Sequence, residues 1–149
     1  MDIGYRDFEK KDFAELREMM FSLYTEDPEG QALSDAKIKK TIDEIAAHPE
    51  KLRVVMLKDG EAHAGYAILV FYWSNEYGGN ILNIDELYIK KEYRGKGLAS
   101  GFFRYLAGAY KDIAALAVET TPSNEIALSL YGRLGFEVSP NKHLLLRND

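Results

Sequence analysis

The segment Arg94-Gly95-Lys96-Gly97-Leu98-Ala99 carries the clearest chemistry in this 149-residue chain. It follows residues 81–89, an apolar stretch typical of a strand, and it opens a stretch to about Tyr110 that is typical of a helix. A glycine turn at the start of a helix exposes main-chain N–H groups without helical partners, and the helix dipole favours an anion there. Glycine lets a phosphate approach because it has no Cβ, and Arg94 and Lys96 add positive charge. The segment therefore predicts a site for a phosphate-bearing ligand.

Two common phosphate-binding loops fit this segment poorly. A Walker A loop requires G-x-x-x-x-G-K-[ST], which Gly95-Lys96-Gly97-Leu98 does not supply. A dinucleotide-binding turn requires G-x-G-x-x-G early in the chain, whereas here the third glycine falls one place late, at Gly101, and the unit comes late in the sequence. From these residues alone, a glycine turn that binds no ligand stays open as a third interpretation.

Composition limits the classes of function. A formal net charge of −5 and a pI near 5.3 disfavour a broad nucleic-acid-binding face and suit a cationic small substrate. The absence of cysteine excludes disulfides, thiolate metal sites and a cysteine nucleophile. His48, His63 and His143 lack metal-ligand spacing, so we expect no metal. No apolar run approaches the roughly 20 residues that span a bilayer, and the N-terminus lacks the pattern of a signal peptide. We expect no membrane partner and a cytoplasmic location.

The elements that must position the glycine turn predict one α/β domain over residues 1–149. Strands are expected at residues 3–6, 52–57, 62–73, 81–89 and 113–119, with Asp59-Gly60 as a hairpin turn and Gly65 as a candidate bulge. Helices are expected after Asp12, Ser34 and Asn124 and at the glycine turn, and two closing strands at residues 136–138 and 144–147. The order β-αα-βββ-α-β-α-ββ indicates a mixed sheet with helices on both faces, antiparallel early and with a splayed parallel pair in the centre.

Two motifs resemble a known family. The glycine turn is similar to the R/Q-x-x-G-x-G/A motif of the GNAT superfamily of acetyl-CoA-dependent N-acetyltransferases, with Ala99 where glycine is commoner. At the expected distance, Asn124-Glu125-Ile126-Ala127-Leu128-Ser129-Leu130-Tyr131-Gly132-Arg133-Leu134-Gly135-Phe136 resembles the family's N-x-x-A-x-x-L-Y-x-x-x-G-F. Leu87-Tyr88-Ile89 resembles the strand end before the first motif. The element order resembles the GNAT fold across nearly the whole chain.

The resemblance implies acetyl-CoA as the cosubstrate and suggests which residues bind it. The pyrophosphate would be held by the main-chain N–H groups of Arg94, Gly95, Lys96, Gly97, Leu98 and Ala99. The pantetheine arm would pair like an added strand with the main chain of Leu87, Tyr88 and Ile89. One such N–H would also stabilise the oxyanion of the tetrahedral intermediate. Asn124 would cap its helix and contact the pantetheine arm.

The resemblance also suggests an acid and a base. Tyr131 matches the tyrosine that many family members place beside the thioester sulfur, where its hydroxyl could protonate the departing thiolate; a core tyrosine is the alternative. Asp85 and Glu86 resemble the carboxylate pair of the diamine and polyamine acetyltransferase branch. In a regular strand only one of them can face the cleft, although a bulge could reverse the choice. We take Asp85 as proton acceptor, directly or through water, and Glu86 as attracting the cation.

The expected activity is transfer of acetyl from acetyl-CoA to a primary amine by direct attack in a ternary complex, with a small cationic, polyamine-like amine favoured. A protein, peptide, aminoglycoside or amino-acid amine is the alternative acceptor, and a non-catalytic acyl-CoA-binding sensor is the alternative class. A homodimer could form, although the sequence does not establish it. The acceptor pocket is expected between the first two helices and the loop from Trp73 to Asn80, with side chains of Tyr24, Glu26, Asp27, Glu29, Tyr72, Trp73, Glu76 and Tyr77.

Overall fold

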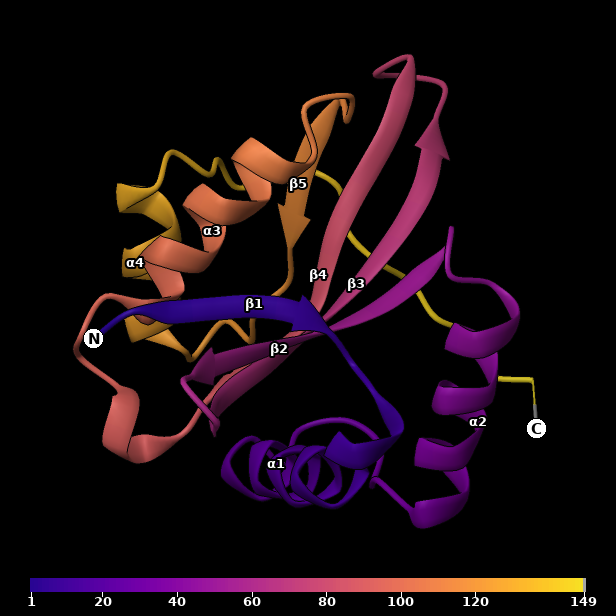
Figure 1. The fold of residues 1–149 in the computed structure, drawn as a ribbon. Coiled ribbons are helices and arrows are strands. Elements are labelled where there is room, and N and C mark those ends of the chain that lie inside the picture. Colours follow the sequence, from indigo (N-terminus) through magenta and orange to yellow (C-terminus); the bar gives the residue numbers. More distant parts are fainter. Residues whose placement is uncertain (149) are drawn as a thin grey trace. The chain divides into compact units, whose positions relative to one another are not determined.

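The computed structural model describes residues 1–148, and its helices and strands follow most of the predicted order (Figure 1). The strands are β1 (Ile3–Asp7), β2 (Leu52–Asp59), β3 (Ala62–Ser74), β4 (Gly79–Ile89) and β5 (Ala115–Val118). The helices are α1 (Phe13–Glu26), α2 (Asp35–Ala47), α3 (Leu98–Ala109) and α4 (Glu125–Arg133), with short 3₁₀ helices η1 (Lys10–Asp12) and η2 (Lys91–Tyr93). These elements fall into two compact units, Met1–Glu119 and a second that begins at Thr120. A single domain over the whole chain stays a prediction.

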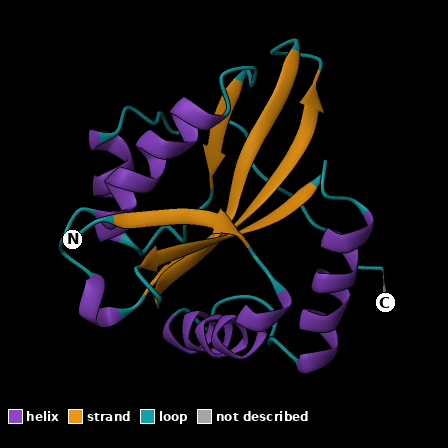
Figure 2. Cartoon of the chain, in the orientation of Figure 1, coloured by secondary structure: helices purple, strands orange, loops and turns teal. Residues whose placement is uncertain are grey.

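A single mixed sheet forms the centre of the first unit. Its strands lie in the order β1-β2-β3-β4-β5, and neighbours are antiparallel except β4 and β5, which are parallel. Helix α3 connects the two parallel strands, as a parallel pair requires. Figure 2 distinguishes the strands of this sheet from the helices that flank it. The α/β class and the mixed sheet are therefore confirmed.

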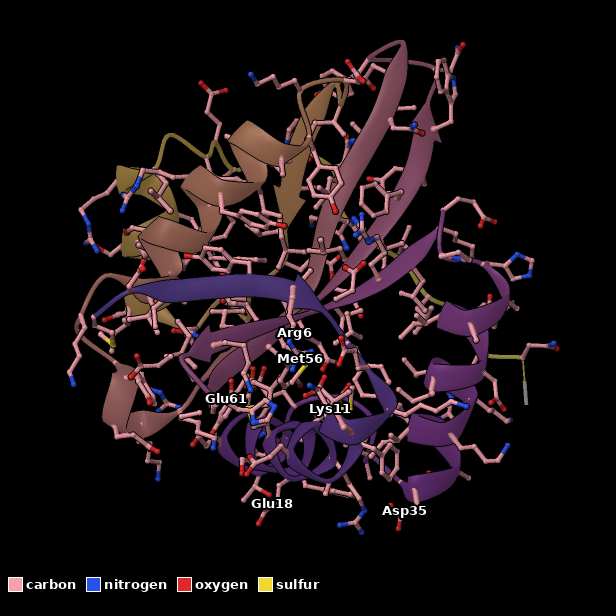
Figure 3. All side chains as sticks on the ribbon, in the orientation of Figure 1. Arg6, Lys11, Glu18, Asp35, Met56 and Glu61 are labelled. Atoms are coloured by element: carbon pink, nitrogen blue, oxygen red, sulfur yellow. The ribbon has the colours of Figure 1, made fainter. Side chains whose placement is uncertain are left out.

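Alternating side chains give the sheet two apolar faces. One face packs against α1 and α2 in a cluster of Leu16, Met19, Met20, Ile38, Val54, Met56, Tyr66, Ile68 and Tyr88. Figure 3 shows Met56 of this cluster between the strands and α1. The other face carries the buried Val55, Leu57, Ala67 and Leu69, and α3 covers it with Phe102, Phe103 and Leu106. The ring of Tyr5 on β1 lies 5.7 Å from that of Phe102. In this unit, helices cover both faces as expected.

A buried ion pair fixes the start of α1 to β1. Asp12 is 1% exposed, and its carboxylate accepts hydrogen bonds of 2.7 and 2.9 Å from the guanidinium of Arg6, which Figure 3 labels. The Glu9 N–H donates to the same carboxylate at 2.9 Å. The bonds from Arg6 hold the pKa of Asp12 far below its usual range. Asp12 lies at the predicted helix start, but its carboxylate binds Arg6 rather than the first helical turn.

Gly65 allows β3 to approach β4 closely. A Cβ at this position would lie 2.2 Å from the carbonyl oxygen of Tyr88, far inside contact distance. The β2–β3 register shifts between Leu57 and Lys58 and leaves Ala64 without a partner, so the bulge lies one residue before its predicted position at Gly65. Glycine is needed here because of the close approach of another backbone.

The second unit contains α4 and no described strand. Residues 136–148 form neither helix nor strand, so the two predicted closing strands are wrong for the described residues. Leu144, Leu145 and Leu146 are 95%, 89% and 97% exposed. A short apolar run forms a strand only when another strand pairs with its main chain. The sequence of the run alone does not show whether such a partner strand exists. Across the part of the chain that the structure describes, every helix is too short or too polar to span a bilayer.

Candidate active site

A bulge in β4 turns two consecutive carboxylates to the same side of the sheet. The β3–β4 register passes from the pair Leu69–Ile84 to the pair Ile68–Glu86, so Asp85 has no partner on β3. Leu69 belongs to the α3 face, whereas Ile68 belongs to the face covered by α1 and α2. The extra residue brings Asp85 to the side of Glu86, and both line one cavity. The expectation that only one carboxylate could face the cleft is wrong, because it assumed a regular strand.

The cavity has a volume of about 330 Å³ and lies between the sheet and the first two helices. Its lining is Met20 and Tyr24 of α1, Gln31, Ala32 and Leu33 of the following loop, Lys37, Ile38 and Thr41 of α2, and Leu52, Ile68, Asp85 and Glu86 of the sheet. A volume of this size suits a small molecule. The first two helices, expected to form part of an acceptor pocket, border this cavity.

The expected contribution of the loop from Trp73 to Asn80 is absent from this cavity. Strands β3 and β4 extend to Ser74 and Gly79, so the loop is a tight turn at the end of a long hairpin. Tyr72, Trp73 and Tyr77 are exposed there and do not line the cavity. Of the aromatic and acidic side chains expected around the acceptor, Tyr24 lines the cavity.

Two tyrosine hydroxyls hold the carboxylate of Glu86. Tyr24 donates to Oε2 at 2.7 Å, and Tyr66 donates to Oε1 at 2.6 Å. Burial raises the pKa of Glu86, while the bonds from Tyr66 and Tyr24 act in the opposite direction. Burial, together with the nearby Glu86 charge, raises the pKa of both tyrosine hydroxyls, so each remains a donor at neutral pH. The orientation of Glu86 is therefore fixed from two elements, α1 and β3.

Asp85 is held differently from its neighbour. No described donor forms a hydrogen bond with its carboxylate, whereas Glu86 has two. Desolvation raises the pKa of Asp85, and the charge of Glu119 adds to that rise. A carboxylate with a raised pKa and open oxygens can accept a proton from a bound ligand. Asp85 is thus the better placed of the two to exchange a proton.

The glycine turn presents a row of unbonded N–H groups. Gly95 and Gly97 have φ of +74° and +80°, a left-handed conformation that favours glycine. No N–H from Gly95 to Ser100 donates to another described group, which makes six in succession. A helix start alone leaves four such groups. Six donors at the positive end of α3 fit the oxygens of a pyrophosphate.

Arg94 binds its own chain rather than standing open to a ligand. Its Nε donates to the Ile89 carbonyl at 2.8 Å, and its Nη2 donates to Oε2 of Glu26 at 2.7 Å. Its main-chain N–H donates to the Lys91 carbonyl at 3.2 Å. The row of unbonded N–H groups therefore begins at Gly95. Glu26, expected near the acceptor, instead joins the end of α1 to this turn.

Strand β4 extends beyond its parallel partner. Its pairing with β5 runs from Ile81 to Ile84, while β4 itself continues to Ile89. The Lys90 N–H donates to the Ala64 carbonyl on β3 at 2.9 Å, and alternation then directs the main chain of Leu87 and Ile89 to the other edge. No described strand pairs with that edge, which could accept an added chain. The Tyr88 side chain belongs to the core.

The two remaining predicted site residues lie in the second unit. The Asn124 side chain accepts a hydrogen bond of 3.1 Å from the Ala127 N–H, so Asn124 caps α4 as expected. The Tyr131 ring packs edge-on against Phe136, with centroids 5.6 Å apart. Burial raises the pKa of the Tyr131 hydroxyl, which keeps it protonated at neutral pH. Their contacts with a coenzyme stay predictions.

The sequence reasoning missed Tyr66 and Lys37. Tyr66 lies on β3, whose pairing with β4 includes a bulge, and only that register brings it to Glu86. Lys37 lines the cavity from the first turns of α2, where a lysine is otherwise typical of a solvated face. A signal for Tyr66 existed in its spacing of two from Ile68, since both belong to one strand face.

Comparison with known proteins shows the family of this chain. The acetyltransferase (GNAT) family matches residues 14–136, and the chain therefore belongs to the GNAT family of acetyltransferases. A possible acetyltransferase from Clostridium difficile 630 has a TM-score of 0.83 at 21% identity, over 99% of both chains. AAC(6')-Iy in complex with the bisubstrate analogue CoA-S-monomethyl-acetylneamine has a TM-score of 0.75 at 18% identity, over 100% of this chain and 99% of that one.

A third solved structure, the ribosomal-protein-alanine N-acetyltransferase from Brucella melitensis biovar Abortus 2308, has a TM-score of 0.78 at 13% identity, over 99% of this chain and 100% of that one. At such identities the likeness concerns the fold. No curated protein matches the sequence.

Proposed function

We propose that this protein is an acetyl-CoA-dependent N-acetyltransferase that acetylates the primary amine of a small acceptor in a ternary complex. The observation that carries the proposal is the β4 bulge, which turns Asp85 and Glu86 into one cavity. Membership of the GNAT family supports the reaction class. The carboxylate pair supports an acceptor that arrives as a cation, since an ammonium ion is attracted to negative charge.

The residues of the glycine turn and the strand edge fit the coenzyme. The N–H groups from Gly95 to Ser100 would bind the pyrophosphate, with Arg94 holding the turn in place through Ile89 and Glu26. The main chain of Leu87 and the N–H of Ile89, on the edge of β4 that no described strand pairs with, would bind the pantetheine arm as an added strand, while the Ile89 carbonyl accepts from Arg94. When bound, acetyl-CoA supplies an activated thioester. AAC(6')-Iy was solved with a CoA-containing analogue, which supports this ligand class.

Asp85 and Glu86 would prepare the amine. Glu86, held by its two tyrosines, attracts the ammonium group, and Asp85 accepts a proton from it directly or through water. The lone pair freed on nitrogen forms the C–N bond of the amide while the C–S bond breaks. Tyr131 would give its hydroxyl proton to the departing sulfur, and the second proton that nitrogen loses as the amide forms would return to the Tyr131 oxygen. The net products are then the amide, the CoA thiol and one proton held by Asp85. Support for Tyr131 and Asn124 comes from their match to the family motif and from the raised pKa of the Tyr131 hydroxyl.

The sequence resemblance favours a polyamine-like acceptor, and the cavity of about 330 Å³ supports a small molecule over a folded protein. A peptide, aminoglycoside or amino-acid amine is the alternative. The two named neighbours, AAC(6')-Iy and a ribosomal-protein-alanine N-acetyltransferase, have similar folds but names that indicate different acceptors. The fold alone therefore does not identify the acceptor. Cytoplasmic location and a homodimer stay predictions.

A binding experiment and a turnover experiment together test the proposal. Calorimetry with acetyl-CoA should show binding, and a panel of primary amines assayed by CoA release should show turnover. Asp85→Asn should lower kcat/KM by about 100-fold or more while the Kd for acetyl-CoA changes less than about twofold. Asp112→Asn, an exposed acid outside the cavity, is the matched control. No binding at millimolar acetyl-CoA overturns the proposal, and binding without turnover of any amine favours the sensor.

A further inference from the structure

The exposed side chain of Lys37 lines the proposed acceptor cavity together with two carboxylates. Lys37 lines it from the helix side, while Asp85 and Glu86 line it from the sheet. The Lys37 ammonium donates to the Ala32 carbonyl at 2.6 Å, and Ala32 also lines the cavity. An ammonium group has three donors, so two stay open to a ligand.

Lys37 has no carboxylate partner among the described residues. Of the lysines near it, Lys39 lies 3.0 Å from Asp43 and Lys51 lies 2.7 Å from Glu44, whereas Lys40 on the same helix, outside the cavity lining, also has no described ion pair. No described carboxylate therefore lies within ion-pair distance of the Lys37 ammonium, which leaves this group available to a ligand in the cavity. Gln31 and Thr41 add uncharged polar groups to the same lining. Such a group of side chains suits a ligand atom that carries negative charge.

The remaining lining is apolar. It consists of Met20, Leu33, Ile38, Leu52 and Ile68, which come from both helices, the loop between them and the sheet. An apolar wall favours methylene groups over a chain with further charges, because burying an unpaired charge is costly. The cavity thus offers carboxylates, an apolar wall and a cation to one small ligand.

We propose that the acceptor is a short amino carboxylate, with its ammonium group at Asp85 and Glu86 and its carboxylate at Lys37. This inference rests on the proposed acetyl transfer and specifies its substrate class. A diamine or polyamine of the same length would bring a second cation to Lys37, where like charges repel. Lys37 is therefore a specificity-determining residue, and the polyamine preference suggested by the sequence gives way to an acceptor of mixed charge.

Matched trios of acceptors test the substrate class. One trio is 5-aminopentanoate, pentane-1,5-diamine and pentylamine, and parallel trios with three to seven carbons cover other lengths. At the best length, the amino carboxylate should exceed the diamine in kcat/KM by about tenfold or more, as expected for a charge-assisted hydrogen bond. A diamine that is the better substrate at every length overturns the inference and leaves the acetyltransferase proposal standing.

Variants of Lys37 test the residue. Lys37→Met should raise the KM for the amino carboxylate by about tenfold, with kcat and the kinetics of pentylamine changed by less than about twofold. Lys37→Arg should keep the preference, and Lys37→Glu should reverse it toward the diamine. Lys40→Met on the same helix, outside the cavity lining, is the control. Equal losses on all three acceptors in Lys37→Met would mean a purely structural role and would overturn the inference.

A direct binding measurement separates this inference from the proposed reaction. Calorimetry of 5-aminopentanoate with the CoA-saturated protein requires no turnover. An approximately tenfold weaker Kd in Lys37→Met than in the wild type supports the carboxylate contact, even if no amine is acetylated. Equal affinities for 5-aminopentanoate in the two proteins, or no binding to either, overturn it.

Discussion

The hydroxyl of Tyr66 lies 2.6 Å from Oε1 of Glu86, and the other carboxylate oxygen receives Tyr24 at 2.7 Å. These bonds join β3, β4 and α1 at one side chain. Burial disfavours the charged form of Glu86, and the two phenolic donors offset part of that effect. The negative charge of Glu86 in the cavity thus depends on Tyr24 and Tyr66, whether or not these two residues contact a ligand.

Tyr66→Phe should move the acidic limb of the pH profile to higher pH. The lost hydrogen bond stabilised the carboxylate form, so its removal raises the pKa of Glu86 above its already raised value. Glu86 then becomes neutral at a higher pH, and attraction of the ammonium group is lost there. The measurement is kcat/KM for the amine acceptor between pH 4 and 8. Tyr77→Phe, an exposed tyrosine at the hairpin end, is the control. An unshifted limb in Tyr66→Phe would show that Glu86 does not govern it.

Gly97→Ala should weaken acetyl-CoA binding by about tenfold or more. Its φ of +80° costs a residue with a Cβ roughly 1 kcal/mol or more, and relief of that strain rotates N–H groups of the turn away from the phosphates. Calorimetry with acetyl-CoA measures the change. Gly108→Ala tests a glycine within the same helix, α3, where a Cβ meets nothing within 4 Å. Equal Kd values for the two variants would remove the turn from the coenzyme site.

Gly65→Ala should destabilise the protein by about 3 kcal/mol, since its Cβ would lie 2.2 Å from the Tyr88 carbonyl oxygen. Backbone atoms must move to relieve this overlap, which also displaces the end of β4. Gly4→Ala is the matched strand control, because its Cβ would meet its nearest neighbour, the Lys58 carbonyl oxygen, at 4.0 Å. Urea denaturation at neutral pH gives both free energies of unfolding. A difference between the variants below about 1 kcal/mol would contradict the prediction.

Asp85→Asn should stabilise the fold at pH 7 although it removes the proposed base. Desolvation raises the pKa of Asp85 in the folded state, so the folded wild type loses stability as pH rises through that pKa. Asparagine has no charge to desolvate, so its advantage appears above that pKa and fades below the ordinary pKa of aspartate. Thermal unfolding midpoints of variant and wild type at pH 7 and pH 3 measure this. An advantage that is larger at pH 3 would contradict the assigned direction.

Regular elements could be predicted from the sequence, whereas the site depended on an irregularity. Residues of α1 and α2 repeat with helical spacing, and their predicted starts at Asp12 and Ser34 fall within a residue of the observed ones. The bulge at Asp85 has no comparable sequence pattern. Alternation of side chains can be read from one strand, whereas a bulge is defined by the pairing of two strands. A register predicted without knowledge of that bulge does not show that Tyr66 lies beside Glu86.

The predicted lining of the acceptor pocket differs from that of the observed cavity for a related reason. A loop was predicted from the polar residues after Trp73. Ser74 and Gly79 instead belong to β3 and β4, so the aromatic side chains lie at the end of a long hairpin and not at the cavity. The glycine turn was recognisable because its chemistry lies in consecutive main-chain groups. The cavity combines residues from six segments, which only packing brings together.

The bulge in β4 is one residue long. Without Asp85, Ile84 would be followed directly by Glu86, and the two would alternate regularly while facing the same sides as now. No pair with β3 or β5 would be lost, because Asp85 pairs with neither. The scaffold therefore does not need the residue on which the proposed proton transfer depends. We therefore expect deletion of Asp85 to leave the sheet and the glycine turn in place while it removes the proposed base.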